Sequence, residues 1–205
     1  MKKIITISRE FGSGGKEIGK LLSEELNISF YDREIINLLS QKTGLSEEYI
    51  EKASDSRIIN PVQNFARSLS MNTSINNNKM ELLISQQKII KEIAEQNDCI
   101  IVGRGADVIL QEYKPYKIFV YSNIETKVKR CFENKTEQEK LTEKEIIKKA
   151  KEIDKSRQKY YDIISDKTWG AKENYNLCIN TSNINIQDII PSLALLINKY
   201  FNEDL

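Results

Sequence analysis

Short runs of apolar residues alternate along the whole chain with longer amphipathic runs. Runs rich in β-branched or aromatic residues predict buried strands at residues 4–7, 28–31, 99–102, 117–121 and 175–179. Apolar residues at three- and four-residue steps predict helices at residues 18–26, 35–39, 80–96, 146–164 and 189–200. This alternation predicts a single α/β domain over residues 1–205 with a mostly parallel sheet. Residues 55–79 are polar and poorly periodic, and they predict a loop or an insertion with broken helices.

Three helix starts can be read from side chains that accept hydrogen bonds from free backbone N–H groups. Asp32 is placed to cap the helix that follows the second strand. Ser122 with Glu125, and Thr142 with Glu145, have the spacing of capping boxes. We therefore expect one further helix to begin near residue 123 and another near residue 143.

Three glycines follow the first predicted strand within four residues. Residues 12–15 read Gly-Ser-Gly-Gly, and Lys16 stands where the next helix opens. Glycines let the backbone turn sharply and aim several N–H groups at one anion, while the helix N-terminus and a lysine add positive charge. The stretch predicts a phosphate-binding loop whose nucleotide-binding residues are Gly12, Ser13, Gly14, Gly15, Lys16 and Glu17.

The loop differs at two positions from the Walker pattern G-x-x-x-x-G-K-[ST]. Glu10 takes the place of the first glycine, and Glu17 takes the place of the hydroxyl residue that binds Mg²⁺. An ordinary strand–helix turn and a dinucleotide-binding loop are the alternatives. The glycine cluster with Lys16 argues against the first. Glu17, where the dinucleotide fingerprint needs glycine or alanine, argues against the second.

Composition excludes several classes of protein. The chain has 205 residues, of which 40% are hydrophobic and 30% charged, and a formal net charge of +1. We expect no nucleic-acid partner because a global basic field is absent, and no membrane partner because no apolar run could span a bilayer. Three scattered cysteines give no disulfide framework, so a cytoplasmic setting is expected. The sequence has no histidine, which excludes histidine triads, metal sites and general bases.

Two arginines lie in positions that suggest contact with an anion. Arg104 stands between two glycines at the end of a predicted strand, where its guanidinium could bind a phosphate through two hydrogen bonds. Arg157 lies on or beside the apolar face of the predicted long helix, three residues after Asp154. Arg157 therefore either pairs with Asp154 or points at a ligand anion.

Six stretches, in their order and spacing, resemble the cytidylate kinase-like family of P-loop kinases. They are residues 4–19, 30–34, 102–107, 117–120, 154–157 and 180–181. The resemblance runs over nearly the whole chain, and it implies a P-loop NTPase three-layer sandwich. It also implies a helical monophosphate-binding insertion at residues 33–96 and a lid at residues 133–161.

The resemblance implies roles for individual side chains. The catalytic residues would be Lys16, Arg130 and Arg157. The substrate-binding residues would be Asp32, Arg33, Arg104, Asp107 and Asp154. ATP and Mg²⁺ would be the cofactors, but the metal ligands stay open because Glu17 could either hold the ion or repel the nucleotide.

The function that we expect is ATP-dependent phosphoryl transfer to a nucleoside monophosphate, with CMP or dCMP as the leading acceptors. Two alternatives stay open on the sequence. One is a P-loop kinase that acts on another small metabolite. The other is a nucleotide-binding regulatory protein without turnover, which the departures at Glu10 and Glu17 suggest.

Overall fold

The structure is a computed structural model that describes residues 2–54, 73–133 and 141–202. One sheet contains the strands β1 (Ile4–Arg9), β2 (Ser29–Tyr31), β3 (Cys99–Val102), β4 (Tyr116–Tyr121) and β5 (Leu177–Asn180). The first α-helices are α1 (Gly15–Leu26), α2 (Glu34–Thr43), α3 (Glu47–Ser54) and α5 (Thr73–Gln96). They are followed by α6 (Ala106–Ile109), α7 (Ile124–Glu133), α8 (Glu143–Ile164) and α9 (Ile186–Asn202). Two short 3-10 helices are η2 (Gln111–Tyr113) and η3 (Lys172–Asn174).

The sheet is parallel throughout, with the strand order β2-β3-β1-β4-β5. β1 is central, since Ile5 pairs with Ile100 of β3 on one side and with Tyr116 of β4 on the other. The five predicted strands are confirmed, with ends that differ by no more than two residues. Because parallel strands share one direction, their carboxyl ends meet along one edge, where ligands bind in folds of this kind.

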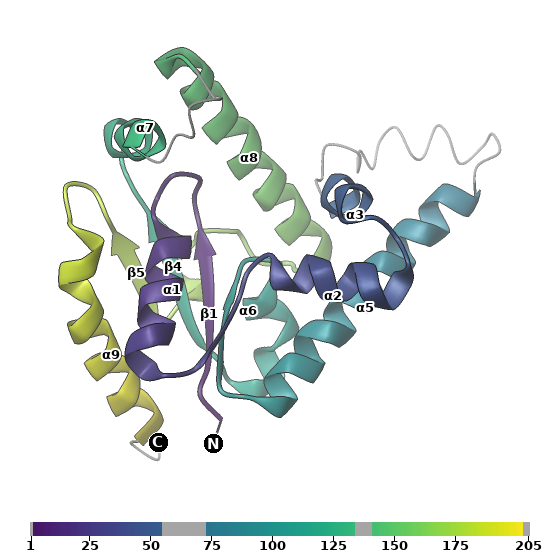
Figure 1. Ribbon diagram of the computed structural model, residues 1–205, viewed down its shortest axis with the longest axis horizontal. Coiled ribbons are helices and arrows are strands. Elements are labelled where there is room, and N and C mark those ends of the chain that lie inside the picture. Colours follow the sequence, from purple (N-terminus) through teal and green to yellow (C-terminus); the bar gives the residue numbers. More distant parts are fainter. Residues whose placement is uncertain (1, 55–72, 134–140, 203–205) are drawn as a thin grey trace.

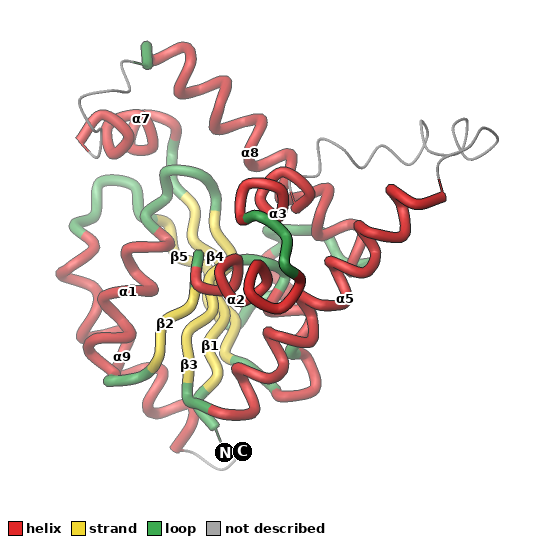
Figure 2. The backbone as a smooth tube through the Cα atoms, turned by 45° about the vertical axis from the view of Figure 1, so that its right-hand side comes forward, coloured by secondary structure: helices red, strands yellow, loops and turns green. Residues whose placement is uncertain are grey.

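Helices cover both faces of the sheet and make three layers (Figure 1). Successive side chains of the central strand point to opposite faces. Ile4 therefore belongs to the apolar core beneath α2, α3, α5 and α6, whereas Ile5 and Ile7 belong to the core beneath α1 and α9. Figure 2 shows the same two helical layers on either side of the strands. The predicted α/β three-layer sandwich is confirmed.

Two helix starts differ from the prediction. α2 begins without a side-chain cap, because the Asp32 carboxylate is turned toward Lys16. α7 is capped by Asn123, whose Oδ1 accepts a hydrogen bond from the Thr126 amide at 2.9 Å. The predicted cap, Ser122, lies one residue before Asn123, and the Ser122 amide donates to the carboxylate of Glu10.

Other boundaries follow more directly from local chemistry. α8 begins at the predicted capping box, in which Thr142 and Glu145 bind each other's backbone amides. α5 begins at Thr73, seven residues before the predicted start at residue 80. The first turns of the helix are polar, and a polar stretch has no apolar period from which a helix could be predicted. Residues 55–72 of the predicted irregular segment and residues 134–140 of the predicted lid lie outside the described residues.

α8 lies across the carboxyl end of the sheet, and the two ends of the chain lie at the opposite end (Figure 1). Near the C-terminus of α8, the Tyr160 hydroxyl donates to the Arg104 carbonyl, and the Tyr161 hydroxyl donates to Asp107 of α6. These contacts place the second half of α8 over the loop that follows β3. Among the helices that the structure describes, none is long and apolar enough to cross a membrane.

Candidate functional site

The predicted phosphate loop, residues 10–14, connects β1 to α1. Gly12 and Gly14 have φ angles of 68° and 81°, in the left-handed region that favours glycine. A β-carbon on Gly14 would also lie too close to the end of the Ile186 side chain in α9, so a side chain at this position would be strained and would displace Ile186. The first turn of α1 lies beside a cavity of about 490 Å³, which is lined in part by Gly12, Gly14, Gly15, Lys16 and Glu17. Ser13 is buried outside this lining, and its hydroxyl donates to the carbonyl of Glu10.

Asp32 brings two cations together beside the phosphate loop. Its Oδ2 lies 2.9 Å from Nζ of Lys16, and its Oδ1 lies 3.5 Å from Nη2 of Arg9. The Lys16 side chain is 60% exposed, whereas that of Asp32 is 13% exposed. The ammonium group is thus free to reach a phosphate in the cavity while its carboxylate partner stays in place.

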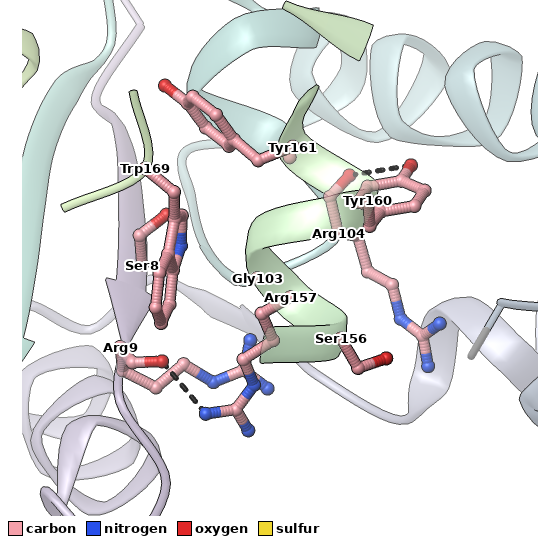
Figure 3. Close-up of a pocket in the computed structure, with 10 residues that line it drawn as sticks. Ser8, Arg9, Gly103, Arg104, Ser156, Arg157, Tyr160, Tyr161 and Trp169 are labelled. Atoms are coloured by element: carbon pink, nitrogen blue, oxygen red, sulfur yellow. Dashed lines mark hydrogen bonds between the residues drawn. The ribbon is translucent and has the colours of Figure 1, made fainter. Parts of the chain in front are cut away.

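A second cavity of about 220 Å³ lies beneath the C-terminal half of α8 (Figure 3). It is lined by Ser8, Arg9, Gly103, Arg104, Gly105, Ser156, Arg157, Tyr160, Tyr161 and Trp169. The lining therefore combines three guanidinium groups with three aromatic rings. Arg9 and Arg157 line the first cavity as well, so the two cavities share a wall of two arginines.

The arginines of this shared wall are held in an environment that disfavours their charge. Burial, together with the positive charge of Arg157, lowers the pKa of Arg9 to about 9, while Asp32 opposes the shift. Burial also lowers the pKa of Arg157, against the attraction of Asp154. An anion bound between the two guanidinium groups would relieve this cost.

Arg157 pairs with Asp154, the first of the two alternatives that the sequence left open, and its contact with a ligand anion stays a prediction. Its Nη1 donates to the backbone carbonyl of Arg9 at 2.8 Å and to Oδ1 of Asp154 at 3.3 Å, and its side chain lines both cavities. The same Oδ1 of Asp154 accepts from the amide of Phe11 in the phosphate loop at 2.7 Å. Asp154 lies outside the lining of both cavities and contacts Arg157 and the loop, and its predicted contact with substrate stays a prediction.

Arg104 reaches the second cavity from a strained turn. It has a φ of 57° and stands between Gly103 and Gly105, which also have positive φ. Its carbonyl accepts from the hydroxyl of Tyr160, which in turn accepts from Nε2 of the buried Gln86 at 2.6 Å. These hydrogen bonds hold the strained backbone, and with it the root of the Arg104 side chain, in one conformation.

The two glycines beside Arg104 make room for other side chains. A β-carbon on Gly103 would collide with the guanidinium of Arg9, and one on Gly105 would collide with Ile164 of α8. The spacing Gly-Arg-Gly thus lets Arg9 and α8 approach the end of β3 closely.

Asp107, which the sequence predicts to bind substrate, is a buried carboxylate. It is 2% exposed and lies beneath the second cavity, outside its lining. Its Oδ2 accepts from the hydroxyl of Tyr161 at 2.9 Å, and its Oδ1 accepts from the hydroxyl of Ser8 at 3.3 Å. Burial raises the pKa of Asp107, against the hydrogen bond from Tyr161. The carboxylate therefore orients two side chains of the lining.

Two other arginines lie away from the shared wall. Arg130 of α7 donates to the Ser13 carbonyl at 3.0 Å, to both the hydroxyl and the carbonyl of Thr181, and to the Ile184 carbonyl. These contacts tie the phosphate loop to the segment after β5. Arg130 also lines the cavity beside the phosphate loop, so its predicted contact with the transferring phosphate stays a prediction. Arg33 is exposed at the start of α2 and lies outside both linings.

Sequence reasoning assigned no role to several side chains that line the second cavity: Ser8, Arg9, Ser156, Tyr160, Tyr161 and Trp169. Arg9 carries a usable signal, because it directly follows a buried apolar run at the carboxyl end of the central strand. Trp169 has no comparable signal. It packs edge-on against Phe119 of β4 at a centroid distance of 5.3 Å, and this contact places it in the lining.

Comparison with known proteins agrees with this geometry. A sequence profile of the Cytidylate kinase-like family matches residues 4–183. The chain is 23% identical to a cytidylate kinase of Clostridium botulinum (strain Loch Maree / Type A3), over 95% of this chain and 97% of that protein. A cytidylate kinase of the Hall strain of Clostridium botulinum has the same identity and coverage.

Solved structures show the same fold. An uncharacterized protein from Eubacterium ventriosum is 26% identical with a TM-score of 0.70, over 97% of this chain and 99% of that chain. Shikimate kinase from Acinetobacter baumannii, solved with shikimate, is 15% identical with a TM-score of 0.55, over 100% and 97% of the two chains. Shikimate kinase from Bacteroides thetaiotaomicron is 13% identical with a TM-score of 0.53, over 95% and 99%. The fold is thus that of P-loop kinases.

Proposed function

The chain belongs to the cytidylate kinase-like family, and we propose that it transfers a phosphoryl group from ATP to a nucleoside monophosphate, with CMP or dCMP as the preferred acceptor. The observation that carries the proposal is the wall shared by the two cavities. Arg9 and Arg157 line the cavity beside the phosphate loop and the cavity beneath α8. A phosphoryl group that moves from a donor in one to an acceptor in the other passes these two guanidinium groups.

The donor site is the cavity beside the phosphate loop. ATP phosphates at the N-terminus of α1 would accept from its free N–H groups, and Lys16 would balance their negative charge. In this proposal Lys16 exchanges its contact with Asp32 for one with a phosphate oxygen.

Mg²⁺ fits this site without a dedicated protein cage. The described residues hold no cluster of three or more histidine, cysteine, aspartate or glutamate side chains suited to a metal. Mg²⁺ at kinase sites needs only one or two carboxylates, since phosphate oxygens and water supply its other ligands. Asp32 beside Lys16, and Glu17 in the first turn of α1, would be these carboxylates. The bound ion would neutralise charge on the phosphate oxygens.

The acceptor site is the cavity beneath α8. Its three guanidinium groups suit a phosphate dianion, which would offset the cost of burying Arg9 and Arg157. Tyr160 and Trp169 supply flat apolar surfaces of the kind that pack against a nucleobase. The preference for a cytosine base comes from the relatives named cytidylate kinase.

The chemistry requires positioning and charge neutralisation, without a covalent intermediate. Charge spreads over the oxygens of the phosphoryl group during transfer, and Arg157 would stabilise it there. Asp154 restricts the Arg157 side chain before the substrates arrive, so less conformational entropy is lost in the transition state.

The test is ADP release from ATP and Mg²⁺ with each acceptor in turn: CMP, dCMP, UMP, AMP, GMP and a small hydroxylated carboxylic acid. We expect release that depends on CMP or dCMP, and its loss in Arg157→Met. Lys155→Met alters an exposed cation on the same helix and serves as the matched control. Release with the carboxylic acid alone would support a metabolite kinase. ATP binding without release for any acceptor would support a regulatory protein.

A further inference from the structure

The side chain of Glu10, at the first glycine of the Walker pattern, leaves the phosphate loop for α7. Its Oε2 lies 2.8 Å from Nζ of Lys127 and accepts from the amide of Ser122 at 3.2 Å. Its backbone carbonyl accepts from the hydroxyl of Ser13 at 2.8 Å, within the loop. A glutamate is accommodated here because Lys127 of α7 supplies a charge, and Ser122 between β4 and α7 supplies an amide, that satisfy its carboxylate.

Lys127 is a buried cation beneath the phosphate loop. Its side chain is 10% exposed, and its ammonium lies 2.8 Å from Glu10 and 3.6 Å from Oδ2 of Asp154. A β-carbon on Gly12 would lie 3.2 Å from the β-carbon of Lys127, so the loop packs directly on this residue. A buried ammonium is costly unless it is paired, which separates Lys127 from the solvated lysines of α7.

Asp154 extends this contact from α7 to α8. Its Oδ2 faces Lys127, while its Oδ1 accepts from the amide of Phe11 and from Nη1 of Arg157. Negative and positive side chains therefore alternate in the order Glu10, Lys127, Asp154, Arg157. One end of this series lies in the phosphate loop, and the other end is the arginine of the shared wall.

We propose that Lys127 is a positioning residue that fixes Arg157 relative to the phosphate loop. The proposal rests on the kinase function argued above. Asp154 contacts the loop directly through the Phe11 amide, and Lys127 adds a second link, because its ammonium contacts both Glu10 and Asp154 among the described ion pairs. A small displacement of a group that must meet the transferring phosphate is costly in rate, even when it originates several residues away.

The first test separates kcat from KM. Lys127→Met should lower kcat by between about tenfold and about 100-fold while the KM for ATP changes little. Lys127→Arg keeps the charge and should recover part of kcat. Lys129→Met is the matched control on the same helix, since Lys129 is 77% exposed and its ion pair with Glu133 among the described residues has a distance of 3.9 Å. Wild-type kcat in Lys127→Met would overturn the proposal.

A second variant separates positioning from stability. Lys127→Met leaves Glu10 without its cation, so its thermal midpoint should fall. Glu10→Gln combined with Lys127→Met removes both charges and should recover the midpoint, whereas kcat should stay low. If kcat and the midpoint recover together, Lys127 is only a charge partner and the positioning role is wrong.

A third measurement does not depend on turnover. Amide hydrogen exchange at residues 11–16 without ligand should be faster in Lys127→Met than in the wild type or Lys129→Met, because the loop loses its support. If the wild type phosphorylates no acceptor, the kinase function fails, and the exchange rates still report on the coupling. Equal exchange in Lys127→Met and Lys129→Met would contradict the coupling whatever the acceptor assay shows.

Discussion

Arg157 donates a hydrogen bond from its guanidinium to the backbone carbonyl of Arg9, at 2.8 Å. The contact fastens α8 to the carboxyl end of the central strand. It also places two partly buried cations next to each other, and the pKa of each is lowered chiefly by loss of contact with water. The fold accepts this unfavourable charge at the junction of two cavities, where an anionic substrate would offset it.

Removing the charge of Arg9 should therefore stabilise the protein without ligand and reduce the stabilisation that bound substrate provides. We expect Arg9→Met to raise or preserve the thermal midpoint without ligand, because a buried cation beside Arg157 is lost. The upward shift of the midpoint that CMP causes in the wild type should disappear. Lys155→Met should keep that shift. A lower midpoint in Arg9→Met together with an undiminished CMP shift would contradict this account.

Gly103→Ala tests the close approach of Arg9 to the end of β3. Alanine costs about 1–2 kcal/mol at a positive φ, and here its β-carbon would also displace the Arg9 guanidinium. Gly44→Ala is the matched control, because Gly44 has a φ of 71° and open space around its α-carbon. Both variants should lose stability in a denaturant titration. Only Gly103→Ala should raise the KM for the acceptor, and equal KM values would count against the close approach.

Arg104→Lys keeps a positive charge at the acceptor cavity but removes the planar fork of donors. We expect the acceptor KM to rise about tenfold, the equivalent of one charge-assisted hydrogen bond of about 1.5 kcal/mol. The KM for ATP should change little, since Arg104 lines the cavity beneath α8 and lies outside the lining beside the phosphate loop. Steady-state kinetics with each substrate varied in turn measures both. An unchanged acceptor KM would place the acceptor phosphate elsewhere.

Asp107 should give the protein a measurable pH dependence of stability. Its pKa is raised above the ordinary value of 3.8, chiefly by burial, so the folded state binds a proton more tightly than the unfolded chain. Its contribution to the free energy of unfolding is therefore greatest below pH 3.8 and is lost as the pH rises through its raised pKa. Asp107→Asn does not titrate. The difference in free energy of unfolding, wild type minus Asp107→Asn, should decrease with rising pH, and a constant difference would contradict the shift.

The predicted lid, residues 133–161, should respond to substrates unevenly. Residues 154–161 already contact the phosphate loop and the end of β3 through Asp154, Arg157 and Tyr160. Residues 143–150 have no such contacts in the described hydrogen bonds and ion pairs. Amide exchange should therefore slow at residues 143–150 when ATP and CMP are both added, with little change at residues 154–161. Identical exchange with and without both ligands would remove the case for a closing lid.

Local patterns explain which parts of the fold could be predicted. The strands and the phosphate loop are visible because apolar runs and clustered glycines act on their own neighbourhood. The inner position of Arg157 follows from the period of a single helix. The contact between Arg9 and Arg157 could not be predicted, because the two residues are 148 positions apart in sequence.

The depth and the partners of individual side chains could not be predicted. A position at a strand end predicts the edge of the sheet at which a side chain lies, but not its depth. The burial of Asp107 and the hydrogen bonds of Arg130 to backbone carbonyls therefore emerge only from the structure. The Asp32 carboxylate could contact either the amides of α2 or the cations beside the phosphate loop. It contacts Arg9 and Lys16, because a cation is a stronger electrostatic partner than an amide.

The central claim is that a phosphoryl group crosses the wall formed by Arg9 and Arg157. Transfer of label from ATP carrying a radioactive γ-phosphate tests it most directly, with CMP or dCMP as acceptor and Mg²⁺ present. The account predicts label in CDP or dCDP with the wild type and none with Arg157→Met. Label that stays in ATP, or that appears only as inorganic phosphate with every monophosphate offered, would contradict it.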